Sequence, residues 1–507
     1  MDVYEGRFYV GFGHNMSQQE VVASRAADWR EASSRAVSPV VVAGILRLAD
    51  IGIISAAGVL AHTTYLGENT EYRSVYYLAI LIGALLSIVV FHVNRLYRIN
   101  GGAVITSSAR LFSSLSAVML SLVVIAYLMH ISELYSRAWV ALWFAASFAA
   151  MSMSRAVLRV LQRRWMREGR LTRTVAIVGG GSHAARLVRR LQVAGQPGMS
   201  ALGVRVVGYF DDRAKRSDPE LTDAGCVRLG TVDDLLMFAR RQPLDQVIVA
   251  LPWSAETRVL QLLRKLRALP IDVALAPDLV GFTVNRSAYS TLGGVLLLQV
   301  FSRPLADWRL IMKDIEDRAL ALLLLVFFGP LLMIISLLIK FDSRGPVLFR
   351  QQRYGFNNQL INVLKFRTMY THLEDRNATR LATRNDPRVT PVGRLLRRMS
   401  LDELPQLVNV LRGEMSIVGP RPHALSAKAA DRLYEDVVEE YAARHRVKPG
   451  ITGWAQVHGW RGETDTYDKI RKRVEYDLFY IENWSLALDI KILLMTAIAV
   501  FRTKNAY

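Results

Sequence analysis

The chain has 507 residues, which is too long for one hydrophobic core and indicates about three or four domains. Hydrophobic residues make up 51% of it and the mean hydropathy is +0.20, which indicates membrane segments beside globular parts. A single cysteine, Cys226, excludes a disulfide framework or a cysteine metal cage, and we expect it to be a small buried residue.

The net charge of +20 predicts acidic partners, which are nucleic acid, anionic lipid head groups or phosphorylated substrates. No zinc-finger or basic-zipper motif is present, and the basic residues cluster beside apolar segments, as in the cytoplasmic loops of membrane proteins. We therefore expect a membrane lipid and a phosphorylated substrate as partners, and no nucleic acid.

Residues 1–39 lack apolar periodicity and have no apolar region beside the initiator, so we predict a disordered tail and no signal peptide. Residues 40–160 then contain apolar runs that are each close to the ~20 residues needed to cross a bilayer. The runs cover about 40–61, 74–93, 111–131 and 138–157. They predict a four-helix transmembrane bundle, in which Arg47 and Asp50 share one helix face and form an ion pair near the interface.

The positive residues predict the orientation of this bundle. Arg95, Arg98 and Arg110 lie between the second and third runs, and seven arginines follow the fourth, from Arg155 to Arg173. The alternate loops carry only Arg73 and Arg137. By the positive-inside rule, both termini and the soluble domains are predicted to be cytoplasmic.

A Rossmann-like α/β domain is predicted at residues 171–302, from strand-like runs at 174–178, 204–210, 246–251 and 271–276 separated by helical patterns. The first strand leads into a G-x-G-x-x-A turn, in which Gly179 and Gly181 are candidate nucleotide-binding residues. The next strand-end acids, Asp211 and Asp212, come roughly thirty positions after Gly179 instead of the ~20 usual for a ribose ligand. A domain that binds no dinucleotide is therefore the alternative.

A further apolar run at about 319–339 is long enough to cross a membrane but contains Pro330 at its middle, where a proline bends a helix. Lys313 and Arg318 precede it, and cations from Lys340 onward follow it, so both flanks are predicted to be cytoplasmic. A re-entrant helix that enters and leaves by one face satisfies this pattern. The alternative is a straight fifth span, which would carry the rest of the chain to the far side.

The stretch from Ser400 to Leu407 places Asp402 and Glu403 inside an apolar frame, between arginines at 394, 397 and 398 and a further one at 421. Neighbours on a helix point about 100° apart, so the two acids can have different roles. In phosphoryl transfer one acid can hold Mg²⁺ while the other attacks phosphorus. The alternative is a capping box, in which Ser400 caps a helix and Glu403 completes the cap.

Five motif blocks carry a specific resemblance to a known family. They are Arg344-Gly345-Pro346 with Phe349-Arg350-Gln351, Lys365-Phe366-Arg367-Thr368-Met369, the stretch from Ser400 to Leu407, the stretch from Ser416 to Pro422, and the stretch from Lys448 to Val457. Together they resemble the bacterial polyprenyl-phosphate sugar-1-phosphate transferases. The four spans and the α/β domain resemble the N-terminal half of the large members, and the closing residues 504–507 resemble the undecaprenyl-phosphate glucose phosphotransferases among them.

The resemblance implies a mainly helical, monotopic catalytic domain at residues 305–507 that transfers glucose-1-phosphate from UDP-glucose to undecaprenyl phosphate and releases UMP. It implies Mg²⁺ as cofactor, exopolysaccharide biosynthesis at the bacterial inner membrane as the setting, and a homo-oligomer or assembly proteins as further partners. The implied roles are nucleophile for Asp402, metal ligand for Glu403, phosphate-binding cations for Arg397, Arg421, Lys365 and Arg367, and the helix bend for Pro330.

Three alternatives stay open from the sequence. The first is the same reaction with UDP-galactose or a UDP-N-acetylhexosamine. The second is a sugar-nucleotide dehydratase or epimerase, which the glycine turn suits, although no tyrosine in the chain has a lysine four residues later. The third is a non-catalytic scaffold for polysaccharide export, against which the intact Asp402-Glu403 pair argues.

Overall fold

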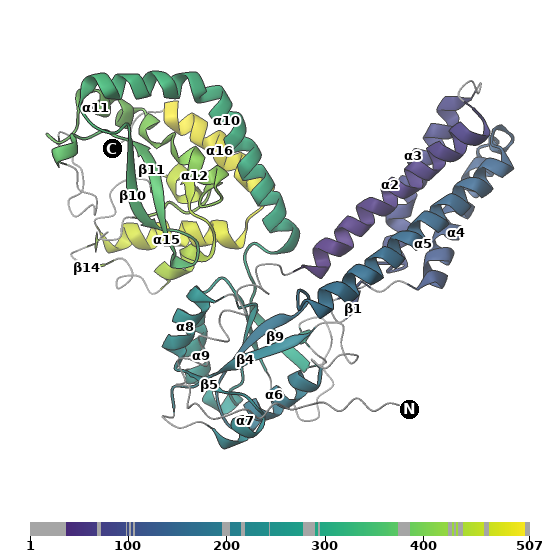
Figure 1. Cartoon of the computed structure of the whole chain (residues 1–507), viewed down its shortest axis with the longest axis horizontal. Coiled ribbons are helices and arrows are strands. Elements are labelled where there is room, and N and C mark those ends of the chain that lie inside the picture. Colours follow the sequence, from purple (N-terminus) through teal and green to yellow (C-terminus); the bar gives the residue numbers. More distant parts are fainter. Residues whose placement is uncertain are drawn as a thin grey trace, which may run out of the picture.

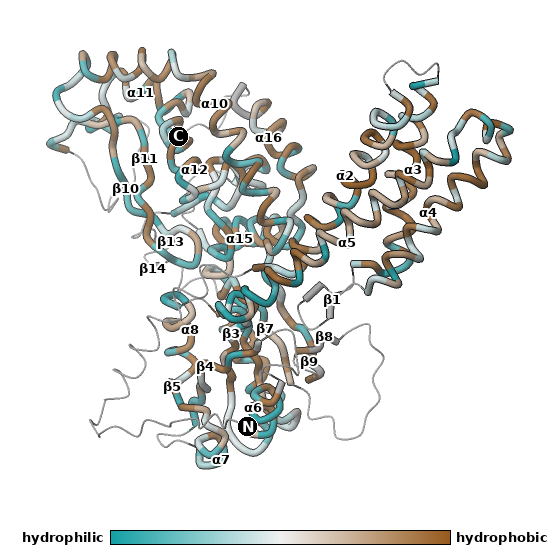
Figure 2. Tube along the Cα trace, turned by 45° about the vertical axis from the view of Figure 1, so that its right-hand side comes forward, coloured by the Kyte–Doolittle hydropathy of each residue, from teal (hydrophilic) through white to brown (hydrophobic). Residues whose placement is uncertain are grey.

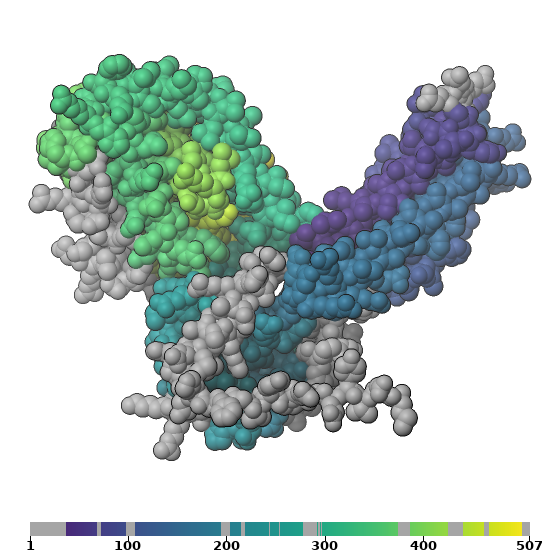
Figure 3. All heavy atoms as spheres, in the orientation of Figure 1, coloured from purple at the N-terminus to yellow at the C-terminus, as the bar shows by residue number. Residues whose placement is uncertain are grey.

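The structure, a computed structural model, describes residues 37–67, 72–97, 99–100, 103–104, 107–194, 203–213, 218–242, 244–276, 289–292, 295–373, 386–423, 428–429, 432–433, 440–460 and 466–501. They form a helix bundle, an α/β unit and a C-terminal unit (Figure 1). In Figure 3 the bundle and the C-terminal unit are two arms that diverge above the α/β unit. The predicted tail lies outside the described residues up to residue 36, and Pro39 begins the first described helix.

The bundle consists of α2 (Pro39–Tyr65), α3 (Arg73–Val93), α4 (Ser108–Leu128) and α5 (Arg137–Arg167), with a short hairpin, β1 (Ile99–Asn100) and β2 (Ala103–Val104), and a 3₁₀ turn, η1 (Ser132–Leu134). All four helices are long and apolar enough to cross a membrane. Serine hydroxyls cap α2, α4 and α5 by accepting a backbone N–H from the first turn. The helices pack α2 on α3 and α5, and α4 on α3 and α5, and apolar residues predominate along them (Figure 2).

A buried carboxylate lies inside the bundle. Asp50 is fully buried and accepts hydrogen bonds from both terminal nitrogens of Arg155, at 2.6 and 2.5 Å, and from the Tyr97 hydroxyl at 2.8 Å. The predicted pair of Arg47 with Asp50 is therefore wrong, and Arg47 instead lies over the Tyr97 ring. The spacing identified neighbours within one helix, whereas the partner is on another helix, 105 positions along the chain.

The α/β unit contains a seven-stranded mixed sheet in the order β5-β4-β3-β6-β7-β9-β8. Its strands are β3 (Arg173–Val178), β4 (Val204–Phe210), β5 (Arg228–Gly230), β6 (Gln246–Val249), β7 (Asp272–Leu275), β8 (Tyr289–Leu292) and β9 (Val295–Phe301). The first five pair in parallel in the doubly wound order that was predicted, and β9 and β8 add an antiparallel edge. Helices α6 (Ser182–Ala194), α7 (Pro219–Asp223), α8 (Val232–Arg241) and α9 (Glu256–Leu266) and the 3₁₀ turn η2 (Trp253–Ala255) complete the unit, and Cys226 is buried as expected.

One long helix, α10 (Asp307–Asp342), opens the C-terminal unit and contains Pro330 in its interior. It is also long and apolar enough to cross a membrane. Figure 1 shows it running along one side of the unit and then turning over its top, and an interior proline accounts for such a bend because it removes a helix hydrogen bond. Both limbs expose apolar side chains, at Leu322, Leu323, Val326, Phe327, Met333, Ile334, Leu337, Leu338 and Phe341.

Short elements fill the space under α10. The antiparallel pair β10 (Leu348–Tyr354) and β11 (Leu360–Phe366) flanks the 3₁₀ turn η3 (Phe356–Asn358), and β12 (Ser416–Val418) pairs in parallel with β15 (Gly450–Thr452). The helices are α11 (Pro391–Arg398), α12 (Gln406–Leu411), α14 (Trp454–Val457), α15 (Tyr467–Glu482) and α16 (Leu486–Phe501), with 3₁₀ turns η4 (Thr371–Leu373), η5 (Leu401–Glu403) and η6 (Tyr441–Arg446) and a small hairpin of β13 (Lys428–Ala429) and β14 (Arg432–Leu433). Their core includes Leu407, Val410, Ile417, Ile470 and Ile481.

The starts of α2 and α10 meet at one end of the bundle. The Ser38 hydroxyl donates to the Asp307 carboxylate, and Gly44 leaves room for the Trp308 ring, since a β carbon there would approach that ring to 2.3 Å. The end of α5 reaches the same place, because the Val37 amide donates to the Arg170 carbonyl at 3.0 Å. Both helix starts and the arginine-rich end of α5 therefore lie together at the same end of the bundle.

We expect Asp50→Asn to lower the free energy of unfolding by about 3–5 kcal/mol, because it leaves the buried Arg155 charge without its carboxylate. Thermal unfolding of the detergent-solubilised protein measures the change. Arg47→Gln on the same helix is the matched control, and it should cost less than about 1 kcal/mol because Arg47 is exposed and stacks on one ring. Equal losses from the two variants would contradict this assignment.

Candidate active site

The octet that carries the acid pair forms a sharp turn between two helices. α11 ends at Arg398, Ser400 has a left-handed backbone with φ of 57°, and Leu401, Asp402 and Glu403 form the 3₁₀ turn η5 before α12. The expected α-helix is thus a tighter turn, with about three residues per turn, so adjacent side chains diverge by about 120°. The capping-box alternative is not realised, because within the described residues the Ser400 side chain forms no capping hydrogen bond.

Glu403 is the buried member of the pair and is held by two cations. Its Oε1 accepts from Lys365 Nζ at 2.9 Å and from Arg421 Nη2 at 2.5 Å, and its Oε2 accepts from Arg421 Nη1 at 3.0 Å. Burial opposes ionisation of this carboxyl, but the charges of Arg421 and Lys365 outweigh it and hold the pKa of Glu403 well below its usual range. Glu403 is therefore a fixed anion that ties η5 to β11 and to the segment after β12.

Asp402 lies beside the same cations without a bond to them. Among the described residues none forms a hydrogen bond with its carboxylate. Burial raises the pKa of Asp402 above its usual value, the charges of Lys365 and Arg397 oppose this, and Glu403 adds to it. The two adjacent acids thus differ in their surroundings, since Glu403 accepts three hydrogen bonds from two cations, whereas neither oxygen of Asp402 accepts one among the described residues.

Arg397 comes from α11, on the side of the pair that faces α10. Its Nε donates to the Thr368 hydroxyl at 2.8 Å, and its charge acts on the Asp402 carboxyl. Leu396, the preceding residue, packs against Ile335 and Ile339 of α10. The structure therefore brings together four of the predicted site residues beside Asp402, namely Glu403, Lys365, Arg421 and Arg397.

Arg367 lies elsewhere, contrary to its predicted place among the phosphate-binding cations. It lies just beyond the end of β11, is 2% exposed, and donates to the carbonyls of Ile339, Ser343 and Arg344 at the end of α10. The strand alternation that would place it beside Lys365 stops at Phe366. Its guanidinium neutralises the carboxyl end of a helix dipole instead of facing the acid pair.

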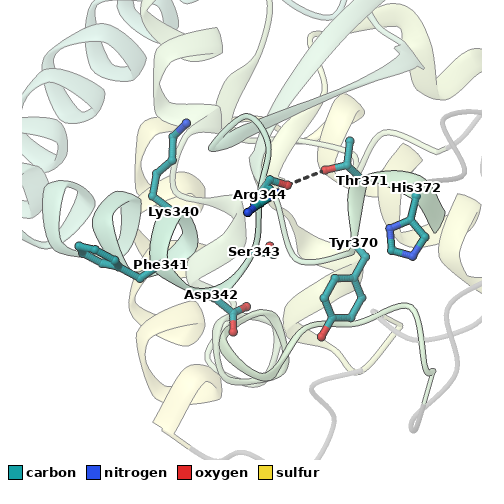
Figure 4. Close-up of a pocket in the computed structure, with 8 residues that line it drawn as sticks. All are labelled: Lys340, Phe341, Asp342, Ser343, Arg344, Tyr370, Thr371 and His372. Atoms are coloured by element: carbon teal, nitrogen blue, oxygen red, sulfur yellow. Dashed lines mark hydrogen bonds between the residues drawn. The ribbon is translucent and has the colours of Figure 1, made fainter.

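A surface hollow of about 820 Å³ lies at this end of α10. Figure 4 shows its lining, with the side chains of Lys340 and Phe341 pointing away from the side that carries Tyr370 and His372. The rest of the lining is Asp342, Ser343, Arg344 and Thr371. Asp402 and Glu403 do not contribute to this hollow, so it is not the place of the proposed chemistry.

Sequence reasoning missed a second layer of buried charge behind Arg421. Arg444 of η6 donates to the Arg421 carbonyl at 2.8 Å and to Asp477 of α15 at 2.7 Å, and Arg353 of β10 donates to the Pro422 carbonyl. These contacts fix the backbone that carries Arg421. The signal in the sequence was a run of charged residues on one face of an amphipathic helix. Such a face is usually exposed to solvent, so the run did not indicate that these residues are buried.

The glycine turn of the α/β unit has the predicted strand-to-helix geometry. Gly179 and Gly181 have φ of 115° and 92°, and a β carbon at Gly179 would lie 2.8 Å from the Ala250 carbonyl oxygen. However, the Gly181 amide donates to the carboxylate of Asp218 at 2.7 Å. The carboxylate of Asp218 thus already accepts the hydrogen bond from the amide that would bind a nucleotide phosphate. This contact argues against a nucleotide site there.

Among the residues that the structure describes, no group of three or more His, Cys, Asp or Glu side chains is arranged to hold a metal ion. Mg²⁺ nevertheless needs only one or two carboxylates when substrate phosphates supply other ligands. Oε2 of Glu403 accepts one hydrogen bond and keeps one lone pair, and Asp402 keeps both oxygens open. The acid pair therefore fits a metal ion that arrives with a diphosphate.

Two family profiles match the chain. Residues 308–503 match the profile described as bacterial sugar transferase, and residues 75–277 match the one described as CoA-binding domain. The first covers α10 and all the predicted catalytic residues.

Relatives with established names extend over both regions. An undecaprenyl-phosphate glucose phosphotransferase of Komagataeibacter xylinus is 45% identical over 67% of this chain, although the match spans only 61% of that relative. UDP-glucose:undecaprenyl-phosphate glucose-1-phosphate transferases of Xanthomonas campestris pv. campestris and Escherichia coli strain K12 are 35% and 40% identical. The former match covers 91% of this chain and 94% of the relative, and the latter 73% and 76%. All three are named as transferases, which sets aside the dehydratase and scaffold alternatives, and the chain belongs to the family of bacterial sugar transferases.

Proposed function

We propose that the protein transfers glucose-1-phosphate from UDP-glucose to undecaprenyl phosphate and releases UMP, as the first step of exopolysaccharide repeat-unit assembly. The observation that carries the proposal is the difference within the acid pair: Lys365 and Arg421 hold Glu403 by three hydrogen bonds, whereas the Asp402 carboxylate accepts none among the described residues. The relatives that match most of the chain are named for this substrate pair.

The reaction then has two balanced steps. Asp402 Oδ attacks the β-phosphorus of UDP-glucose, a phosphorus–oxygen bond forms, the anhydride bond breaks, and its electron pair leaves on UMP. The phosphate oxygen of undecaprenyl phosphate next attacks the same phosphorus and releases Asp402. Lys365, Arg397 and Arg421 surround the carboxylate and offset the negative charge that gathers there.

The predicted Mg²⁺ is part of the proposal. Glu403 would hold it through Oε2, Asp402 lies beside that position, and the diphosphate would supply the other oxygens. When bound, the metal ion withdraws charge from the diphosphate and so eases attack by an anion. Asp402 and the three cations orient the reacting phosphate.

The membrane arrangement is a further part of the proposal. We take α2 to α5 as transmembrane and α10 as re-entrant, with Pro330 at its bend and the soluble units in the cytoplasm. The shared level of the α2 start, the arginine-rich α5 end and the α10 start supports this, as do the cations that flank α10 on both sides. The acid pair then lies near the head groups, where a lipid phosphate is available. A homo-oligomer and contacts with assembly proteins stay predictions from the resemblance.

The function is tested by incubating membranes that carry the protein with undecaprenyl phosphate, Mg²⁺ and one labelled UDP-sugar at a time. We expect label in the lipid fraction with UDP-glucose, and much less with UDP-galactose or a UDP-N-acetylhexosamine. Label from one of these and none from UDP-glucose would overturn the sugar and leave the reaction class standing.

Asp402→Asn should reduce transfer on the order of a thousandfold or more, because an amide oxygen is a poor nucleophile. The substitution keeps the size of the side chain, so the folded protein should still bind UMP with unchanged affinity. Initial rates of lipid labelling measure the loss. Activity within tenfold of the wild type would remove Asp402 from the nucleophile role.

Removal of divalent metal by EDTA should abolish transfer, and added Mg²⁺ should restore it, because the diphosphate would otherwise repel the attacking carboxylate. Ca²⁺ is the control cation, since it prefers more ligands at longer distances and should restore little activity. Full transfer in the presence of EDTA would exclude the metal from the mechanism.

A reporter fused after Tyr507 tests the re-entrant arrangement. A cytoplasmic location is expected, since α10 would return to the side on which it enters. Its control is a second reporter in the loop before α3, which should lie outside. A Tyr507 reporter found outside the cell would establish a straight fifth span.

A further inference from the structure

A buried arginine of α15 is not used by the site described above. Arg473 is 3% exposed, and its Nε has no hydrogen-bond partner among the described residues. Asp477, one turn further along the same helix, directs its carboxylate to Arg444. Burial, and next the charge of Arg444, lowers the pKa of Arg473 to about 9. Burial of a charged guanidinium costs desolvation free energy unless an anion pairs with it.

A second guanidinium faces the same space. Within the described parts of the chain, Arg353 donates to neutral oxygens alone, those of Gln351 and Pro422, and burial followed by the charge of Arg421 lowers its pKa to about 10. The charges of both arginines act on His423. Burial, and then the charges of Arg444, Arg473 and Arg353, hold its pKa well below its usual range. The imidazole is therefore neutral and provides no counter-charge.

The carboxylates nearby are already engaged. Glu403 is bonded by Arg421 and Lys365, and Asp477 by Arg444. These ion pairs leave Arg353 and Arg473 without a hydrogen-bonded carboxylate among the described residues. The buried space behind Arg421 thus has a surplus of positive charge that suits a phosphate.

This surplus lies on the opposite side of the acid pair from the membrane. Arg397 belongs to α11, which packs under the second limb of α10, whereas α15 packs on η6 and lies toward the α/β unit (Figure 1). The contact of α15 with the α/β unit is direct, since Arg267 just after α9 bonds to Glu482 of α15 and to Glu440 beside η6. In the membrane arrangement proposed above, the α11 side therefore suits the lipid phosphate and the α15 side the soluble nucleotide.

We propose that Arg473 and Arg353 bind the α-phosphate of the sugar nucleotide, the group that leaves as UMP. The inference rests on the proposed transfer from a uridine diphosphate sugar. When the anhydride bond breaks, its electron pair goes to an oxygen of this phosphate, and the two guanidinium groups accept the charge there. Arg397 serves the lipid phosphate, which enters in line with the Asp402–phosphorus bond after UMP has left.

The test measures UMP binding to the full-length protein in lipid nanodiscs by isothermal titration calorimetry, with Mg²⁺ present. Arg473→Gln should raise the Kd for UMP by about tenfold or more, as expected for the loss of one charge-assisted hydrogen bond. Arg353→Gln should act in the same direction, and Arg473→Lys should fall between Arg473→Gln and the wild type. Arg471→Gln is the matched control, because Arg471 is exposed on the same helix, and it should leave the Kd unchanged.

Steady-state kinetics distinguish binding of the nucleotide phosphate from binding of the lipid phosphate. The KM for UDP-glucose should rise with the Kd for UMP in Arg473→Gln, whereas the KM for undecaprenyl phosphate should stay within about twofold of the wild type. A rise confined to the lipid substrate would overturn the nucleotide assignment. An unchanged Kd for UMP in a folded Arg473→Gln would show that the arginine has only a structural role, and would overturn the inference as well.

The test depends neither on the Arg473→Gln variant alone nor on the identity of the sugar. Should Arg473→Gln fail to fold, the half-buried Arg353 carries the test, and an unchanged Kd for UMP in Arg353→Gln then overturns the inference. UMP is common to all UDP-sugars, so the binding measurement does not depend on the sugar. A wild type that binds UMP through Arg473 but transfers no glucose would overturn the glucose assignment and support this inference.

Discussion

The C-terminal unit depends on one buried ion triad, in which Glu403 accepts three hydrogen bonds from Lys365 and Arg421. The triad joins three segments that are distant in sequence, which are β11, the turn η5 and the chain after β12. A buried carboxylate with two cations costs desolvation energy, and its bonds must offset that cost through good geometry. A substitution at any of the three positions would therefore leave a buried charge unsatisfied, and this fixes the turn that presents Asp402.

A second buried network connects this turn to α10. Lys313 of α10 donates to Asp317 at 3.0 Å and to Asp489 of α16 at 2.6 Å, and Asp317 accepts from the Ile417 amide of β12 at 2.9 Å. β12 leads within three residues to Arg421. Buried hydrogen bonds thus join the first limb of α10 to the segment whose arginine holds Glu403, so the depth of α10 in a bilayer would set the height of Asp402 above it.

The sequence allowed much of this organisation to be predicted, because local signals decide it. Apolar runs of bilayer length became α2 to α5 and α10, and alternating strand and helix patterns became the doubly wound sheet. What failed depends on long-range contacts. Asp50 bonds to Arg155 across the bundle and not to Arg47, and Arg367 turns toward α10 where β11 ends. Arg473 and Arg353 gave no signal, because charged residues are usually on the surface and only the packed fold buries them.

The two adjacent acids gain different roles from an unequal distribution of cations. Both cations that reach Glu403 by hydrogen bond also act on Asp402 through space, yet neither bonds to it. Their charge therefore favours the ionised form of Asp402 against burial, while its oxygen lone pairs stay available for a bond to phosphorus. If the cations were shared equally, each carboxylate would have an oxygen blocked by a donor and neither would be a free nucleophile.

Environments that push the pKa values of two neighbouring acids apart are the usual means of giving one group a structural or metal-binding role and the other the chemistry. In this site, that separation follows from the two hydrogen bonds by which Arg421 holds Glu403, and thus from the segment after β12 that Arg444 and Arg353 keep in place.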